Sequence, residues 1–449
     1  MDPTPDMTFK TCLACVLLFL PAALANAQSI PHSLSGIHAE DRARVVLQLT
    51  GSAPAPGRLL FDLYPVERSE DLVHWEPFAL LLRTNASAAP LALQDARPVS
   101  GSGFYRTPTN HFLTALRLPT GPSPVGVTNR LLTDPSRTNR YGIKTNSSFM
   151  ATIWYPAVRQ AGGYPSAYVE TNLAAQAGVV YDSPSTMGLL VGTGSTGLAP
   201  AGGGPWPVVL YSHGYPTHRR QNTGKCEELA SHGYVVVAVD HEDCFGTVFP
   251  DGRFIPGRYN PNPAESDLTR TTAGRLADLV FVLDSLPLWN RDDPVLGGQL
   301  DLKRIGSLGF SHGGNAAGEL GRLDPRCGAV AFLEAYLYGL TALRTNGLPV
   351  PTLQVYQSTA EDIYGFANVQ AVYTNTRTNI YYCQVRGTDH GAFSDPWQSA
   401  YANVAVRRAE DAMRACLVAF FDRHLKGTDA ALLDNPTNTF PVLFKFKRE

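Results

Sequence analysis

The sequence predicts an α/β protein in which a mostly parallel β-sheet is flanked by helices and preceded by a small β module. Beyond residue 112, short apolar runs alternate with amphipathic segments, as in sheets covered by helices on both faces. Before that residue, short alternating runs are separated by Gly, Pro, Ser and Asn. The chain has 449 residues, of which 44% are hydrophobic, which is enough for a large core.

Individual elements of the larger part can be placed from these patterns. Several of its apolar runs are rich in Val, Ile and Tyr, as buried strands are. The predicted strands span residues 151–155, 208–212, 234–240, 305–310, 329–333, 352–357 and 380–385. The predicted helices include residues 223–231, 268–286, 314–322 and 405–425. The stretch 161–204 is rich in Gly, Ala, Ser and Pro, and we expect it to be an excursion over the sheet.

The beginning of the chain has the pattern of an export signal. Lys10 precedes an apolar run over residues 12–24, and a small-x-small pattern ends at Ala27. The run is shorter than the roughly 20 apolar residues that a membrane-spanning helix requires. We therefore expect residues 1–27 to be a cleaved signal peptide and the mature protein to be secreted or periplasmic. Residues 28–112 are predicted to form a small accessory β module that serves as a spacer or docking unit.

Charge and cysteine content exclude several classes of protein. The net charge of −2 offers no general attraction to nucleic acid, so we expect no nucleic-acid partner. After removal of the predicted signal, the number of cysteines is odd, which implies at least one free thiol. These cysteines are Cys226, Cys244, Cys327, Cys383 and Cys416. Beyond the predicted signal, the sequence contains no Cys-x-x-Cys or histidine cluster, so it predicts no metal site and no cofactor.

The most informative motif lies at residues 309–314, directly after a predicted strand. It contains the pattern Gly-x-Ser-x-Gly with Ser311 at its centre, which is typical of the nucleophile elbow of the α/β-hydrolase fold. At such an elbow the serine has a strained backbone, and side chains at Gly309 and Gly313 would collide with the strand and the helix. The motif indicates an esterase or lipase with Ser311 as nucleophile.

Chain order then identifies a candidate base. Hydrolases of this fold carry their triad in the order nucleophile, acid, histidine. Of eleven histidines, only His390 and His424 lie beyond Ser311 by more than one position. His424 falls at the polar end of a predicted long helix, whereas His390 falls in a loop directly after a predicted strand. We therefore expect His390 to be the general base.

Two carboxylates are candidates for the acid of the triad. Glu334 and Asp362 both follow predicted strands beyond the elbow. The acid must accept the Nδ1 proton of the histidine and stabilise the imidazolium. Asp389 adjoins His390 in the chain and is too close to reach that nitrogen comfortably. Residue spacing alone therefore leaves Glu334 and Asp362 as alternatives.

A second loop has the pattern of an oxyanion hole. Residues 211–216 run from a predicted strand into a turn that contains Gly214. In this fold one donor comes from such a loop and the other from the residue after the nucleophile. We expect these donors to be the backbone N–H groups of Tyr215 and His312. Pro216 has no N–H, so Gly214 is the alternative to Tyr215 in this loop.

Several separate blocks of sequence carry a family resemblance. They are residues 119–126, 134–137, 153–156, 211–214, 230–241 and the elbow itself. In order and spacing these blocks resemble the plasma-type platelet-activating factor acetylhydrolases, a calcium-independent serine esterase family of the α/β-hydrolase fold. In that family the acid stands in a hydrophobic-acid-Ala-aromatic context, which Leu333-Glu334-Ala335-Tyr336 matches with glutamate in place of the usual aspartate. The resemblance therefore favours Glu334 over Asp362.

The resemblance implies an exported serine carboxylic-ester hydrolase that cleaves short acyl esters, as a 1-alkyl-2-acetylglycerophosphocholine esterase does. Its partner would be a small-molecule or lipid ester, with peripheral contact to lipid surfaces. Relatives of this fold also cleave lactones and polyesters, so hydrolysis of extracellular esters that are not lipids is an alternative. A domain retained only for binding is a third hypothesis, which the presence of nucleophile, base, acid and oxyanion loop disfavours.

Overall fold

The computed structural model divides into two compact units, Met1–Ala115 and Leu116–Glu449. The sequence pattern placed the corresponding boundary at residue 112. The predicted signal peptide, residues 1–27, lies outside the described residues. The structure describes residues 32–41, 44–51, 62–69, 76–83, 91–95, 104–106, 114–138, 146–158, 164–170, 173, 190–395 and 404–449.

The first unit contains two antiparallel sheets of three strands each. One has the order β1 (His32–Asp41), β2 (Arg44–Gly51) and β5 (Leu91–Asp95). The other has the order β4 (Glu76–Arg83), β3 (Asp62–Ser69) and β6 (Phe104–Arg106). The described part of this unit is therefore built from strands.

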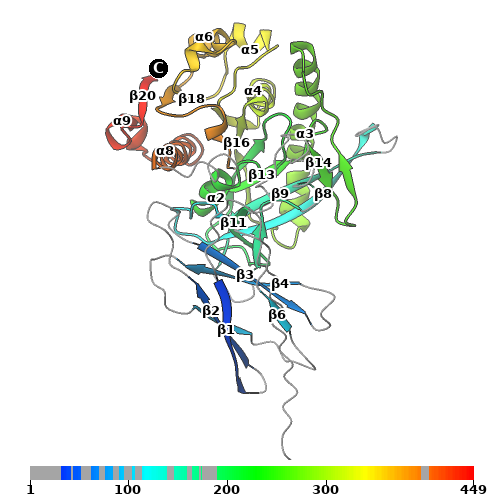
Figure 1. Ribbon diagram of the computed structural model, residues 1–449. Coiled ribbons are helices and arrows are strands. Elements are labelled where there is room, and N and C mark those ends of the chain that lie inside the picture. Colours follow the sequence, from blue (N-terminus) through cyan, green and yellow to red (C-terminus); the bar gives the residue numbers. More distant parts are fainter. Residues whose placement is uncertain are drawn as a thin grey trace, which may run out of the picture. The chain divides into compact units, whose positions relative to one another are not determined.

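The second unit is an α/β-hydrolase fold built on one large mixed sheet (Figure 1). The order is β10 (Tyr164–Ala167), β11 (Leu190–Thr196), β8 (Val125–Thr138), β9 (Asn146–Pro156), β13 (Val235–Val239), β12 (Trp206–Ser212), β16 (Leu300–Phe310), β17 (Cys327–Leu333), β18 (Thr352–Gln357), β19 (Ile380–Val385) and β20 (Leu443–Arg448). From β13 to β19 every neighbouring pair is parallel. A separate hairpin joins β14 (Gly246–Val248) to β15 (Phe254–Pro256).

Helices cover both faces of this sheet. They are α2 (Thr223–Ser231), α3 (Glu265–Asp292), α4 (His312–Leu323), α5 (Thr341–Asn346), α6 (Phe366–Asn375), α8 (Val404–Phe421) and α9 (Pro436–Thr439). Alternate strand residues contact opposite layers, since Val209 packs with α2 and α8 whereas Val208 packs with α3 and α4. In Figure 1, β16 and β18 lie between α4 and α8. None of the described helices combines the length and apolar character that a bilayer crossing requires.

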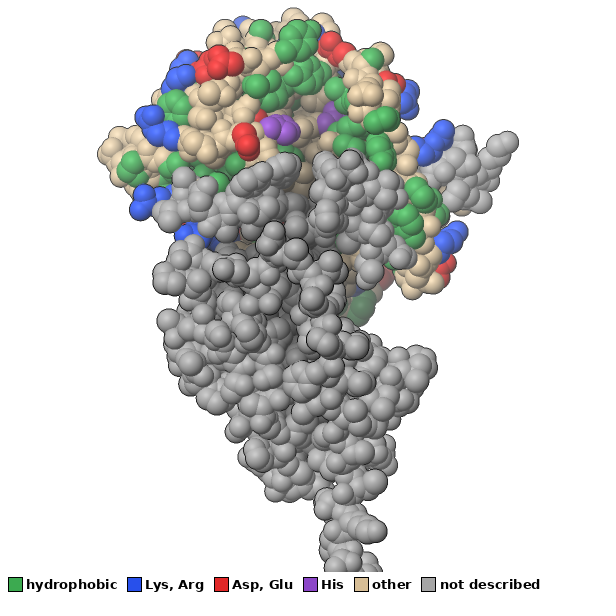
Figure 2. Space-filling model, viewed as in Figure 1, with side chains coloured by type: hydrophobic (Ala, Val, Ile, Leu, Met, Phe, Trp, Pro, Cys, Tyr) green, Lys and Arg blue, Asp and Glu red, His purple; other side chains and the backbone are tan. Residues whose placement is uncertain are grey.

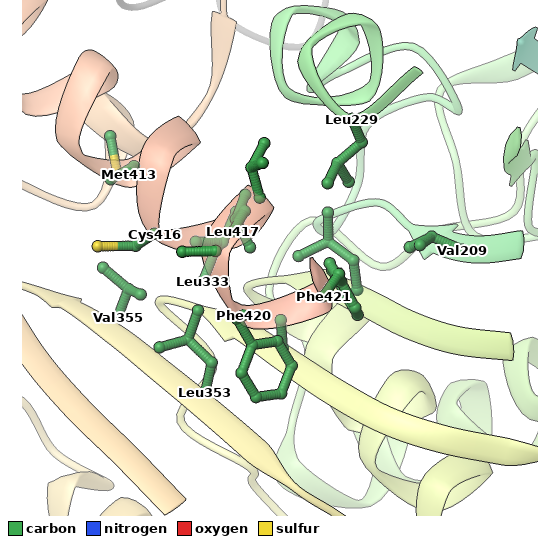
Figure 3. Close-up of a cluster of buried hydrophobic side chains, with 14 of the residues drawn as sticks. Val209, Leu229, Leu333, Leu353, Val355, Met413, Cys416, Leu417, Phe420 and Phe421 are labelled. Carbon is green, nitrogen blue, oxygen red and sulfur yellow. The ribbon is translucent and has the colours of Figure 1, made fainter. Parts of the chain in front are cut away.

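The core beneath α8 fixes the strands that lead to the site. Figure 3 shows Leu333, Leu353 and Val355 of β17 and β18 close to Phe420 and Leu417 of α8. All five side chains have at most 1% of their surface exposed. The ends of these strands are therefore held in fixed positions relative to one another.

The structure confirms the predicted strands and helices of the larger unit, with small shifts at their ends. The expected excursion over residues 161–204 is corrected in part, because β10 and β11 lie within it and extend the sheet. Their Gly-, Ser- and Pro-containing sequences lack a clear alternation, which explains why they were missed. All five cysteines beyond the predicted signal are buried, and none of them is joined to another in a disulfide.

Candidate active site

Ser311 lies at the sharp turn between β16 and α4. Its φ of 52° and ψ of −126° are strained for a residue with a side chain. A Cβ at Gly309 would lie 2.4 Å from the carbonyl oxygen of Gly313. A Cβ at Gly313 would lie 2.0 Å from the carbonyl oxygen of Ser212. Both glycines of the motif are therefore required by backbone packing around the serine.

His390 lies next to Ser311, although the two residues are far apart in the chain. Its Nε2 is 3.0 Å from Oγ of Ser311, and its ring packs 5.1 Å from that of Phe310. The imidazole follows β19 and is 48% exposed. Figure 2 shows histidine side chains (purple) reaching the surface of this unit, with hydrophobic side chains (green) nearby. His424, the other candidate, instead contacts the hydroxyl of Tyr381 at 3.2 Å.

Glu334 is the carboxylate that contacts His390. Its Oε2 lies 3.1 Å from Nδ1 of His390, and its side chain is fully buried. Its Oε1 accepts the backbone N–H of Gln357 at 2.5 Å, and Oε2 accepts the hydroxyl of Tyr336 at 3.3 Å. Asp362, the alternative acid, lies in an exposed 3₁₀ turn and has no contact with His390 among the described residues. With Nδ1–H donated to Glu334, Nε2 is free to accept the proton of Ser311.

Two backbone N–H groups are the candidates for an oxyanion hole. His312 is the first residue of α4, where a helix leaves its N–H groups without intrahelical acceptors. In the loop after β12, the N–H of Gly214 is donated to Oε1 of Gln221 at 2.8 Å. Among the described residues, the N–H of Tyr215 has no acceptor. The geometry therefore favours Tyr215 over Gly214 as the donor from this loop.

Comparison with known proteins agrees with this geometry. A family model described as "Platelet-activating factor acetylhydrolase, isoform II" matches residues 113–249. The search of curated proteins finds no match. The solved structure of a ferulic acid esterase from Streptomyces cinnamoneus is similar to this chain, with 26% sequence identity and a TM-score of 0.63. The similarity covers 74% of this chain and 99% of that chain. The chain is thus similar to platelet-activating factor acetylhydrolase-like esterases of the α/β-hydrolase fold. The predicted resemblance and the predicted fold are confirmed.

The family match covers only part of the site of this hydrolase. It includes Tyr215 but ends before Ser311, Glu334 and His390. The roles of these three residues consequently rest on the distances that join them.

Gln221 links the two loops of this site, and sequence reasoning missed it. Besides the N–H of Gly214, its Oε1 accepts the hydroxyl of Thr217 at 2.6 Å. Its backbone carbonyl accepts the N–H of Asp395, in the segment that follows His390, at 3.2 Å. A glutamine before a helix belongs to no recognised motif, so no signal in the sequence could have identified it.

A buried ion pair contacts the backbone of the loop after β12, which carries Tyr215. Arg275 is almost fully buried, pairs with Asp243 at 2.9 Å and donates to the backbone carbonyl of His213. Burial alone would raise the pKa of Asp243, but the guanidinium of Arg275 holds that pKa below its ordinary value. Burial lowers the pKa of His312 to about 3, so its imidazole is neutral and contacts the hydroxyl of Thr271 at 2.8 Å. The side chain of His312 therefore has a structural contact, separate from its backbone N–H.

No group of three or more His, Cys, Asp or Glu side chains is arranged to hold a metal ion in the part of the chain that the structure describes. The site itself presents a serine, an imidazole and a carboxylate, together with backbone donors.

Proposed function

We propose that this hydrolase is a serine esterase with Ser311 as nucleophile, His390 as general base and Glu334 as the acid. The observation that carries the proposal is the continuous hydrogen-bonded relay from Ser311 Oγ to His390 at 3.0 Å and from His390 to Glu334 at 3.1 Å. The first bond joins the atoms between which the proton moves, and the second orients the imidazole and stabilises its charged form. The strained elbow supports the same conclusion, since it presents the hydroxyl above the sheet.

The mechanism follows from the atoms that face one another. His390 Nε2 removes the proton of Ser311 while Oγ bonds to the carbonyl carbon of the ester, and the carbonyl oxygen becomes an oxyanion. The N–H groups of Tyr215 and His312 donate to that oxyanion, and Glu334 stabilises the imidazolium. The proton on Nε2 then passes to the departing alcohol as the tetrahedral intermediate collapses to an acyl-serine. Water, deprotonated by the same nitrogen, releases the acid and regenerates Ser311.

The decisive experiment replaces the nucleophile. Ser311→Ala is expected to lower kcat on the order of 10⁶-fold with p-nitrophenyl acetate, by comparison with triad deletions in other serine hydrolases. A fluorophosphonate probe should label the wild-type protein and leave this variant unlabelled. Ser285→Ala, which removes a hydroxyl bonded only within α3, is the matched control and should keep full activity. Full turnover by the Ser311 variant would disprove the proposal.

For the substrate we propose a short acyl ester, as in platelet-activating factor acetylhydrolases. The family model over residues 113–249 supports this choice. The likeness to a ferulic acid esterase over 99% of that chain supports a second candidate, an ester that is not a lipid. Acetylated phosphatidylcholine in vesicles, methyl ferulate and a series of p-nitrophenyl esters of increasing acyl length should be compared directly. Preference for the vesicle substrate would favour the lipid esterase and contact with lipid surfaces.

We also propose that the enzyme is exported and acts outside the cytoplasm. The basic residue, apolar run and small-x-small pattern within residues 1–27 support this proposal. N-terminal sequencing of the mature protein should begin at Gln28, and an intact N-terminus would contradict it.

A further inference from the structure

Two stacked tyrosines lie in the loops that follow β17 and β18. The rings of Tyr338 and Tyr364 are 6.0 Å apart and nearly parallel, at 15°. Tyr338 is half-buried, whereas Tyr364 is 83% exposed. One face of Tyr364 therefore packs on Tyr338, and its other face is open to solvent.

The local backbone is shaped to hold this pair. The hydroxyl of Tyr338 donates to the backbone carbonyl of Tyr364. Gly365 has a φ of 102°, and a Cβ there would lie 2.5 Å from the ring of Tyr338. The turn can approach the ring this closely only because residue 365 is glycine.

Contacts join Tyr338 to the elements that carry the proposed triad. Asn315, one turn after Ser311 in α4, donates to the backbone carbonyl of Tyr338 at 3.0 Å. The ring of Tyr336, whose hydroxyl contacts Glu334, lies 6.3 Å from that of Tyr338. A row of aromatic rings therefore runs from the acid of the proposed triad to the exposed ring of Tyr364.

A second aromatic pair joins the loop after β12 to the segment before α3. Tyr215 packs edge-on against Tyr259 at 6.5 Å and against His312 at 5.9 Å. Both aromatic pairs adjoin residues that bond to the start of α3. Glu265 accepts the N–H of Gly339, which follows Tyr338, at 2.8 Å. Asp267 accepts a hydrogen bond from the side-chain amide of Asn260, which follows Tyr259, at 3.0 Å. Aromatic rings are therefore present on both of the segments that contact the start of α3.

We propose that Tyr364, supported by Tyr338, is a substrate-binding residue that stacks against an aromatic ring of the ester. This inference rests on the proposed esterase function and specifies its substrate class. Aromatic rings pair favourably in offset or edge-on arrangements, for which a single free ring face suffices. A quaternary ammonium group is instead held by several rings that enclose it. The open face of Tyr364 fits the first chemistry and not the second.

The test compares Tyr364→Ala and Tyr364→Phe on matched esters. Phenyl acetate and methyl benzoate carry the ring on the alcohol and the acid respectively, and ethyl acetate and methyl butyrate are their aliphatic controls. We expect Tyr364→Ala to raise KM for at least one aromatic ester by about 2- to 12-fold, the factor that one aromatic pair contributes, with kcat unchanged. Tyr364→Phe should behave as wild type, because it keeps the ring.

Leu323→Ala removes a side chain that is 53% exposed at the far end of α4, and it should change none of these constants. Three results would overturn the inference: an equal change for aromatic and aliphatic esters, no change in Tyr364→Ala, or a wild-type enzyme that cleaves only aliphatic esters. Each of these leaves the proposed esterase function intact, since that function fails only if Ser311→Ala stays active.

Discussion

Replacing Glu334 by Gln tests the proposed relay at its most buried member. The N–H of Gln357 lies 2.5 Å from Oε1, so the amide of the variant keeps its oxygen at that position. Its NH₂ group then takes the place of Oε2, 3.1 Å from Nδ1 of His390. Because an amide nitrogen only donates, Nδ1 must accept, and the imidazole carries its proton on Nε2. In this tautomer Nε2 cannot remove the proton of Ser311.

We expect Glu334→Gln to lower kcat on the order of 10⁴-fold, as the equivalent aspartate-to-asparagine change does in a serine protease. The variant has the same shape and keeps the bond from Gln357, so its thermal unfolding should resemble that of the wild type. Steady-state hydrolysis of p-nitrophenyl acetate measures the effect, with Asp362→Asn as the exposed carboxylate control. The reasoning is refuted if Glu334→Gln stays within about tenfold of wild type, or if Asp362→Asn loses more activity.

Two further predictions concern the support of the site. Burial raises the pKa of Asp395 from 3.8 to about 8, so the stability that its protonated form contributes is complete below about pH 4 and lost as pH rises through 8. Asp395→Asn should therefore show a smaller fall in melting temperature between pH 4 and 8 than the wild type, and an unchanged fall would contradict this. Gln221→Leu leaves the buried N–H of Gly214 without its acceptor, which should lower the free energy of unfolding by about 1–3 kcal/mol. Gln221→Glu keeps an acceptor oxygen at this position and is the control. We expect kcat to fall more in Gln221→Leu than in Gln221→Glu. Equal kcat in the two variants would show that this bond does not position the loop.

The sequence was sufficient to predict the central strands and the order of the proposed triad. Apolar runs and the elbow pattern are local features of the sequence, so they indicate strands and a turn without knowledge of contacts between distant segments. The choice between Glu334 and Asp362 is different, because both follow adjacent parallel strands, β17 and β18. Only the fold determines which carboxylate lies against His390 and which lies in an exposed turn.

Other features depend on contacts between distant segments. Gln221 joins the loop after β12 to the segment after His390, and no local pattern marks such a link. Strand β20 is another case, although its alternation of Phe444 and Phe446 with Lys445 and Lys447 is a strand signal that could have been interpreted. It was missed because it follows a long helix at the very end of the chain.

The position of Glu334 has a consequence for how this enzyme can diversify. The acid stands at the end of β17, the strand beside the one that carries the nucleophile. The loop after β18 therefore supplies no member of the proposed triad, yet it carries Tyr364. Sequence changes in that loop can alter which esters are held without disturbing the machinery that cleaves them. Grafting the loop from one relative to another is accordingly a route to new selectivity at constant chemistry.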